Sequence, residues 1–123
     1  MARYVILEHD YPELHWDFML ESLAADGRHV LKTWRLAKAP ASRGERIAAV
    51  ALADHRLFYL DYEGPVQENR GNVTRWDQGE YESLATQPGQ ELRVLLKGKR
   101  IQGTAVLASD GAVWSFFVDE ACR

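Results

Sequence analysis

The chain has 123 residues, a length typical of one compact domain, and we expect a single domain over residues 1–123. Hydrophobic residues make up 46% of the chain, which is enough for a substantial core, and the charged fraction of 27% is ordinary for a water-soluble protein. The formal net charge of −3 argues against a broad basic surface for nucleic acid, although it leaves room for a small basic pocket.

The chain has one cysteine, Cys122, which excludes an intramolecular disulfide and a cysteine-rich zinc site. Any metal ion must therefore be held mainly by His, Asp or Glu side chains. No apolar run approaches the ~20 residues that cross a bilayer, and the N-terminus lacks the apolar core of a signal peptide. We expect a cytoplasmic protein that does not contact membranes.

Short apolar segments recur along the chain, and their composition is typical of strands. They are rich in β-branched and aromatic residues, and turn-forming sequences separate them. Several short strands at this spacing indicate an all-β barrel or sandwich. The segment SDGA (109–112) is a good hairpin turn. We expect strands over residues 4–9, 15–21, 29–36, 46–53, 56–63, 72–76, 91–97, 100–107 and 112–118.

Helical signals are few. Pro12 allows one helical turn over residues 10–13, because proline is tolerated at the first helical position. Residues 78–87 are predicted to form a short helix, and residues 43–49 could begin another. Residues 38–44 are predicted to be a loop within the domain. The sequence therefore predicts a mainly β protein with one or two short helices.

The segment HDYPELHWDFMLE (9–21) holds a candidate metal site. Side chains alternate between the two faces of a strand, so a strand over residues 15–21 places His15 and Asp17 together on one face. His9 precedes a proline-containing turn and can fold back as a third ligand. Two imidazoles and one carboxylate suit Mn²⁺, Fe²⁺ or Zn²⁺ better than Ca²⁺ or Mg²⁺. The same spacing is also common on the solvated face of an ordinary strand, so both interpretations stay open at this point.

A second polar cluster lies in ADHRLFYLDYEG (53–64). If this segment is a strand, His55 and Tyr59 share a face and can both reach one pocket. The same pattern would arise if neither residue had a function: His55 would then simply begin a strand, and Tyr59 would pack across strands.

Five ordered motifs resemble the 3′-phosphoesterase domain of bacterial DNA ligase D, which also occurs as stand-alone proteins. The resemblance runs through nearly the whole chain. The segment at 9–21 is similar to the family's H-D-x-x-x-L-H-x-D-F-R-L-E. The other similar segments are LKTWRLAKAP (31–40, family L-K-S-W-x-x-P-K-x-P), ADHRLFYLDYEG (53–64, family E-D-H-P-x-x-Y-x-x-F-E-G), WDQGEYE (76–82, family W-D-x-G-x-x-E), and RIQGTAVL (100–107) with WSFF (114–117), which match the closing strands.

The resemblance implies a fold and an activity. The fold is a single closed or partly open β-barrel of about eight strands. The activity is removal of a terminal ribonucleotide and then a 3′-phosphate from DNA ends with Mn²⁺, and Zn²⁺ or Co²⁺ are alternative metals. By position, the metal ligands of the family match His9, His15 and Asp17. Its second essential histidine matches His55 and its pocket tyrosine matches Tyr59, which implies a catalytic role for both.

The residues implied to bind phosphate match the family less closely. Lys38 matches the lysine of the family's P-K-x-P motif, and Arg46 lies one residue away from a phosphate-contacting arginine. Met19 is the largest departure, because the family has an arginine there and methionine cannot donate a hydrogen bond. Losing one such donor can cost on the order of 10²–10³ in rate. Arg35 is our candidate substitute.

These features lead us to expect a Mn²⁺-dependent 3′-phosphoesterase, a monomer, that trims DNA or RNA 3′ ends in DNA repair beside other end-joining or repair proteins. A second hypothesis is a divergent non-catalytic module that binds metal or nucleic-acid ends, which Met19 and the acidic balance favour. A third is a small Fe²⁺ oxygenase-like barrel with His15, Asp17 and His55 as its facial triad. The third hypothesis fails if His9 completes the ligand set instead.

Overall fold

Antiparallel strands make up nearly all of the regular structure. The computed structural model describes residues 2–84, 91–110 and 113–119. Alternating apolar and polar residues, rich in Val, Ile, Leu and aromatic side chains, favour extended chain with one buried face. The elements in chain order are β1 (Ala2–His9), β2 (His15–Leu23), β3 (His29–Leu36), β4 (Ile47–His55), the 3₁₀ helix η1 (Leu57–Asp61), β5 (Gly64–Pro65), β6 (Asn72–Ser83), β7 (Glu91–Gly98), β8 (Gln102–Ser109) and β9 (Trp114–Val118).

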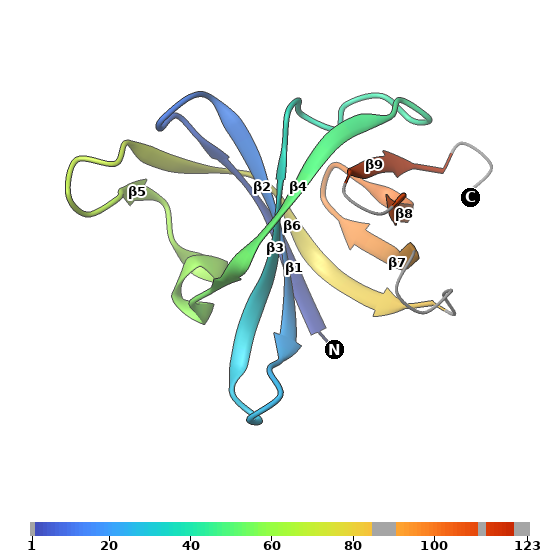
Figure 1. The fold of residues 1–123 in the computed structure, drawn as a ribbon, viewed down its shortest axis with the longest axis horizontal. Helices are drawn as coiled ribbons and strands as arrows, with labels where there is room; N and C mark the ends of the chain where they lie inside the picture. Colours follow the sequence, from blue (N-terminus) through green and yellow to red (C-terminus); the bar gives the residue numbers. More distant parts are fainter. Residues whose placement is uncertain (1, 85–90, 111–112, 120–123) are drawn as a thin grey trace.

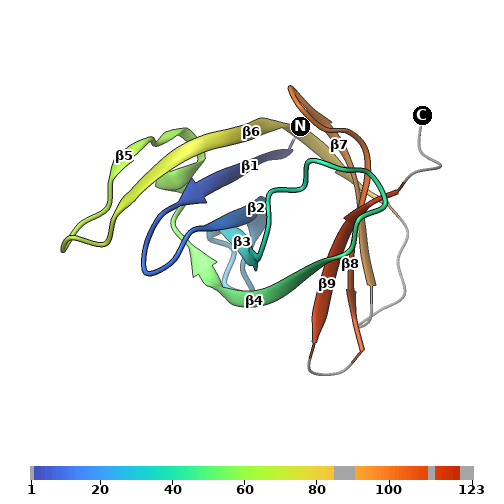
Figure 2. The same cartoon turned by 90° about the horizontal axis from the view of Figure 1, so that it is seen from above.

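Eight of these strands close into a barrel. Their order around the sheet is β1-β2-β3-β4-β9-β8-β7-β6, and β6 pairs back onto β1. The short β5 pairs only with β6 and lies outside the ring. Figure 1 places β5 and η1 on one side of the molecule and β7, β8 and β9 on the other, and Figure 2 shows the ring from above. The predicted mainly β barrel of about eight strands is confirmed.

Two separate apolar clusters lie on the two sides of the β1–β2–β3 wall. The first fills the barrel and draws residues from all eight strands of the ring, including Phe18, Leu20 and Phe116. The second covers the outside of the wall, where Met19 and Leu31 pack against Leu60 of η1. Since successive side chains of a strand point to opposite faces, β2 contributes to both clusters. The outer cluster supports the segment that carries the candidate site.

The segment 56–63, predicted to be a strand, folds differently. Its central part is the 3₁₀ helix η1, and only two residues, Gly64 and Pro65, continue as strand β5. Within η1 only Leu60 is buried, and Phe58 is exposed. One buried side chain per turn suits a short helix laid on the barrel wall better than a paired strand with a buried face.

The helix predicted over residues 78–87 is wrong for the part that the structure describes. Residues 78–83 extend β6 to 12 residues, and residues 85–87 lie outside the described part of the chain. The strand forms because β6 pairs with β1 on one side and with β7 on the other. Gly79 permits this close approach, because a Cβ there would collide with the Lys97 carbonyl oxygen. Non-local pairing overrides local helix propensity here.

The two other helical expectations also fail. Residues 10–13 form no helical turn: residues 11–13 are bends with a cis Tyr11–Pro12 peptide bond, and Ile47–Ala49 belong to β4. In the predicted turn 109–112, residues 111 and 112 lie outside the described residues. The flanking residues still fit a hairpin, since Ser109 pairs with Trp114 across β8 and β9.

Asp77 holds the turn between β7 and β8 against β6. Its buried carboxylate accepts hydrogen bonds from the backbone N–H groups of Lys99, Arg100 and Ile101 at 3.0, 2.8 and 3.1 Å. It also accepts the Tyr4 hydroxyl at 2.7 Å. Burial, followed by the hydrogen bond to Asp77, raises the pKa of Tyr4, so its hydroxyl stays a donor. The aspartate of the WDQGEYE motif therefore closes the barrel and lies apart from the candidate site.

Among the described residues, no helix has both the length and the apolar character that crossing a membrane requires.

Candidate metal and phosphate site

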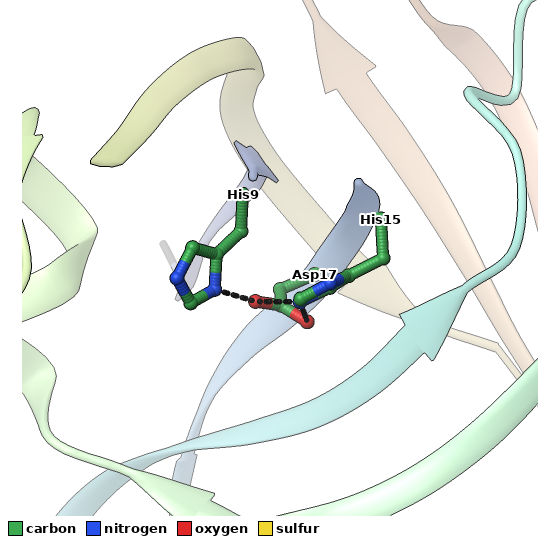
Figure 3. A group of neighbouring side chains, drawn as sticks. All are labelled: His9, His15 and Asp17. Carbon is green, nitrogen blue, oxygen red and sulfur yellow. Dashed lines mark hydrogen bonds and ion pairs between the residues drawn. The ribbon is translucent and has the colours of Figure 1, made fainter. Parts of the chain in front are cut away.

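The β1–β2 hairpin brings the three predicted metal ligands together on the outside of the barrel wall (Figure 3). His9, the last residue of β1, pairs directly with His15, the first residue of β2. Asp17 lies two residues further on β2 and therefore on the same face as His15. One ligand atom from each side chain lies within 4.8 Å of the other two, a spacing that a single cation can bridge.

The two imidazoles present nitrogen lone pairs to the Asp17 carboxylate. His9 Nε2 lies 2.9 Å from the Arg70 carbonyl oxygen, and His15 Nδ1 lies 2.8 Å from the Glu13 carbonyl oxygen. A carbonyl oxygen can only accept, so each of these nitrogens carries the proton in the neutral ring. The other nitrogens, His9 Nδ1 and His15 Nε2, lie 3.6 and 3.2 Å from Asp17 oxygens. Carbonyl groups that fix the tautomer in this way are typical of metal-binding histidines.

Asp17 is almost completely buried, with 3% of its surface exposed. Its Oδ1 atom has no hydrogen-bond partner among the described residues. A buried carboxylate oxygen without a donor is unfavourable, and the lone pairs that two neutral imidazoles turn toward the carboxylate add to the cost. A divalent cation between the three groups would satisfy the carboxylate and both nitrogens, so the residues fit a metal ion with mixed nitrogen and oxygen ligands.

The predicted iron-oxygenase triad does not match this geometry. The structure gathers His9, and not His55, with His15 and Asp17. The candidate ligand cluster therefore contains His9 in place of His55, which argues against the third hypothesis.

The aspartate that follows His9 holds the loop that supplies the Arg70 carbonyl. Its carboxylate accepts the backbone N–H of Asn72 at 2.7 Å. Gly71 has a φ of +78°, and a Cβ at this position would collide with the Asp10 carboxylate and with Tyr11. Only glycine fits this left-handed position so close to another loop. Asp10 and Gly71 thereby position the hydrogen-bond acceptor of His9.

An extra residue in β4 directs His55 toward the same side of the wall. Between Leu31 and Thr33, β3 advances by two residues, while the opposite residues of β4 advance by three, from Leu52 to His55. Directly opposite residues share a face, so His55 takes the outward position that Asp54 would occupy in a regular strand. Bulges of this kind often re-aim side chains beside active sites.

Tyr59 comes to His55 from the first turn of η1. The two rings lie 6.1 Å apart in an edge-on arrangement. The predicted proximity is therefore present, although a strand was predicted to provide it and a 3₁₀ helix does. His55 Nδ1 lies 3.0 Å from the Ala53 carbonyl oxygen and so carries a proton, which leaves Nε2 to exchange protons with a ligand.

A cavity of about 490 Å³ joins the metal-ligand cluster to His55 and Tyr59. Met19 contributes to its wall, with 1% of its surface exposed, and offers no hydrogen-bond donor. The cationic side chains lining the cavity are Arg35, Arg56 and Arg70.

Arg35 lies beside the candidate metal ligands. It pairs directly with Asp17 across β2 and β3, so the two side chains share the outer face. Its Nε atom is buried and has no hydrogen-bond partner among the described residues. Arg35 also lines the cavity, so the end of its guanidinium can reach an anion there, as expected for a substitute for the arginine absent at Met19.

The structure places the two other predicted phosphate ligands away from the cavity. Lys38 lies in the loop after β3, where its ammonium pairs with Glu45 at 2.7 Å. Arg46 lies just before β4, and its guanidinium carbon is 4.3 Å from the centre of the Phe117 ring. Neither residue lines the cavity that holds His9 and His55.

Two arginines of the cavity were not predicted from the sequence. Arg56 follows His55 directly, at the position where the family motif has proline, and that difference was a detectable signal. Arg70 lies in the segment 65–73, which matches no family pattern, so no sequence signal identified it. Both arginines are exposed, and neither forms an ion pair with a described carboxylate.

The fold and the site together define a small eight-stranded barrel protein in which a candidate metal site, a His-His-Asp cluster, lies beside an arginine-lined cavity. Residues 7–109 match the family described as the DNA ligase D 3′-phosphoesterase domain. The chain therefore belongs to this family.

Two similar relatives are much longer proteins. One is the multifunctional non-homologous end joining protein LigD of Pseudomonas aeruginosa, 32% identical over 90% of this chain. The other is the protein of the same name from Mycolicibacterium smegmatis, 30% identical over 91% of this chain. The chain spans only 16% of the length of each of these relatives.

Proposed function

We propose that this protein is a metal-dependent phosphoesterase that trims the 3′ ends of nucleic acid during DNA end repair. The observation that carries the proposal is the cavity that joins the His9, His15 and Asp17 cluster to His55, Tyr59 and Arg35. Family membership and the two end-joining relatives support this choice of substrate.

The metal ion that we propose is Mn²⁺, with Zn²⁺ or Co²⁺ as alternatives. His9 Nδ1, His15 Nε2 and an oxygen of Asp17 would hold it. When bound, such an ion neutralises charge on a phosphate oxygen and lowers the pKa of a coordinated water molecule.

The other residues of the cavity have roles that follow from their donor groups. Arg35 can donate two parallel hydrogen bonds to a phosphate group, and Tyr59 can donate one from its hydroxyl. When the His55 ring carries two protons, Nε2 can deliver one to the leaving oxygen and then regain one from solvent, while Nδ1 stays bonded to the Ala53 carbonyl. We keep Lys38 and Arg46 only as candidates for contacts with more distant parts of the substrate.

The test is removal of a 3′-terminal ribonucleotide or 3′-phosphate from a labelled primer–template in the presence of Mn²⁺. The wild-type chain should trim both ends. His15→Ala should not, because it removes one of three ligands. His29→Ala is the matched control, since His29 is an exposed histidine at the start of β3 that does not line the cavity. Equal trimming by wild type and His15→Ala would reject the proposal.

Met19 favours a second candidate function, a non-catalytic module that binds metal or nucleic-acid 3′ ends. The residue fills the place of the family's arginine with a side chain that cannot donate. This alternative predicts that Mn²⁺ and 3′-phosphorylated DNA bind while neither end is trimmed.

A further inference from the structure

A group of aromatic side chains lies next to the cavity, and of these only Tyr59 has a part in the proposed chemistry. Phe58, Tyr59 and Tyr62 come from η1 and its end, and Arg56 precedes them. We call these four residues the aromatic shelf. A second, smaller cavity of about 210 Å³ runs along the shelf, and Arg56, Tyr59 and Val66 line both cavities. The shelf therefore continues directly from the candidate phosphate site.

The rings of the shelf pack against one another and are fixed in place. The ring centres of Phe58 and Tyr62 lie 4.6 Å apart, and the two rings are tilted by 33°. The Tyr62 hydroxyl donates to the Pro65 carbonyl at 2.5 Å and anchors the inner ring. Tyr59 contacts both rings edge-on, at 5.3 and 6.1 Å. A rigid ring pair loses little conformational freedom when a third flat group stacks on it.

The outer ring of the pair faces solvent. Phe58 has 54% of its surface exposed, although phenylalanine is usually buried in folded proteins. The guanidinium carbon of Arg56 lies 5.7 Å from the Phe58 ring centre and 5.9 Å from that of Tyr59. The surface thus combines an exposed aromatic face with an unpaired positive charge, and this combination suits a flat group linked to an anion.

We infer that the aromatic shelf stacks the base of an unpaired nucleotide whose phosphate occupies the adjoining cavity. This inference rests on the proposed function and adds to it that the substrate end is single-stranded or frayed, because an unpaired base can turn a face to the shelf, whereas neighbouring bases cover both faces of a base inside a duplex. Base stacking on aromatic side chains tolerates any base, so the shelf selects for strand geometry and not for sequence.

The test is binding of two labelled single-stranded oligonucleotides, measured by fluorescence anisotropy with Mn²⁺. Both carry a terminal 3′-phosphorothioate that slows hydrolysis, and one lacks the terminal base. For the intact oligonucleotide, Phe58→Ala should weaken binding on the order of 5- to 150-fold. For the abasic one, the same substitution should change the affinity less than twofold. Phe58→Tyr keeps the ring and should bind like the wild type.

Leu23→Ala is the matched control, because Leu23 is as exposed as Phe58, at 61%, and lines neither cavity. It should bind both oligonucleotides like the wild type, and melting temperatures should establish that every variant is folded. Equal effects of Phe58→Ala on both oligonucleotides, or no effect on either, would overturn the inference. Trimming by the wild-type chain is measured in parallel: absent trimming marks failure of the proposed function, whereas normal trimming without a base-dependent effect marks failure of the shelf alone.

Discussion

The same substitution at two equally buried aspartates should have opposite effects on stability. Asp17 and Asp77 each have 3% of their surface exposed. The Asp77 carboxylate accepts four hydrogen bonds, whereas Oδ1 of Asp17 has no hydrogen-bond partner among the described residues. If donors determine the stability of a buried carboxylate, Asp77→Asn should destabilise the protein strongly and Asp17→Asn should not.

The magnitude for Asp77→Asn follows from its contacts. Oδ2 accepts from the Tyr4 hydroxyl and from the Ile101 N–H, and the amide can replace only one oxygen. Two buried donors then lose their acceptor at about 1–3 kcal/mol each, or about 2–6 kcal/mol in all. At roughly 4 °C per kcal/mol for a domain of this size, the melting temperature should fall by about 8–24 °C. Tyr4→Phe, which removes one of the four donors, should cost only about 1 kcal/mol.

For Asp17→Asn without metal, the expected change runs from zero to a gain of about 2 kcal/mol, because the amide can donate to a histidine lone pair. Mn²⁺ at 100 times its dissociation constant should stabilise the wild type by about 2.7 kcal/mol, or about 10 °C, and should leave this variant unchanged.

The assay is thermal unfolding of the wild type and the three variants, with chelator and with Mn²⁺. Asp77→Asn should lose the same amount of stability in both conditions, because its carboxylate lies apart from the metal-ligand cluster. A loss for Asp17→Asn in chelator as large as that for Asp77→Asn would refute the reasoning about the unsatisfied carboxylate. A wild type that gains no stability from Mn²⁺, and none from Zn²⁺ or Co²⁺ in the same assay, would refute the metal site itself.

Three further outcomes are expected. Gly71→Ala should weaken Mn²⁺ binding at least several-fold in a calorimetric titration, because its Cβ pushes the loop that supplies the acceptor of His9 away from Asp10; unchanged affinity would mean that this loop does not position His9. Arg35→Ala should lower kcat/KM on the order of 10²-fold, whereas Lys38→Ala should change kcat/KM by no more than about threefold, since of the two only Arg35 lines the cavity. Equal losses in the two variants would mean that Arg35 is not the residue that contacts the phosphate. Met19→Arg should raise trimming and lower stability by about 1–3 kcal/mol, because the new side chain replaces one that is 1% exposed; a drop in both quantities would mean that the cavity has no room for a second guanidinium at this position.

Local sequence pattern was sufficient wherever a property depends on the period of a strand. Alternation along β2 predicted that His15 and Asp17 share a face, and the structure has this arrangement, with Phe18 on the opposite face inside the barrel. The motif order also predicted the family and the barrel. The shared face of His15 and Asp17 follows from neighbouring residues alone, because the side-chain period of two fixes the face of each residue as soon as the strand exists.

Only the tertiary structure decided how the rest of the site is assembled. The extra residue that turns His55 outward is visible only when β4 is paired with β3. Arg70, whose carbonyl fixes the tautomer of His9, is 61 residues away in the chain, and no motif records the contact. Lys38 matched the family motif, yet its side chain does not line the cavity and forms an ion pair with Glu45 in the same loop. Register, bulges and loop contacts are set by pairing between distant segments, and the pattern of any one segment does not contain them.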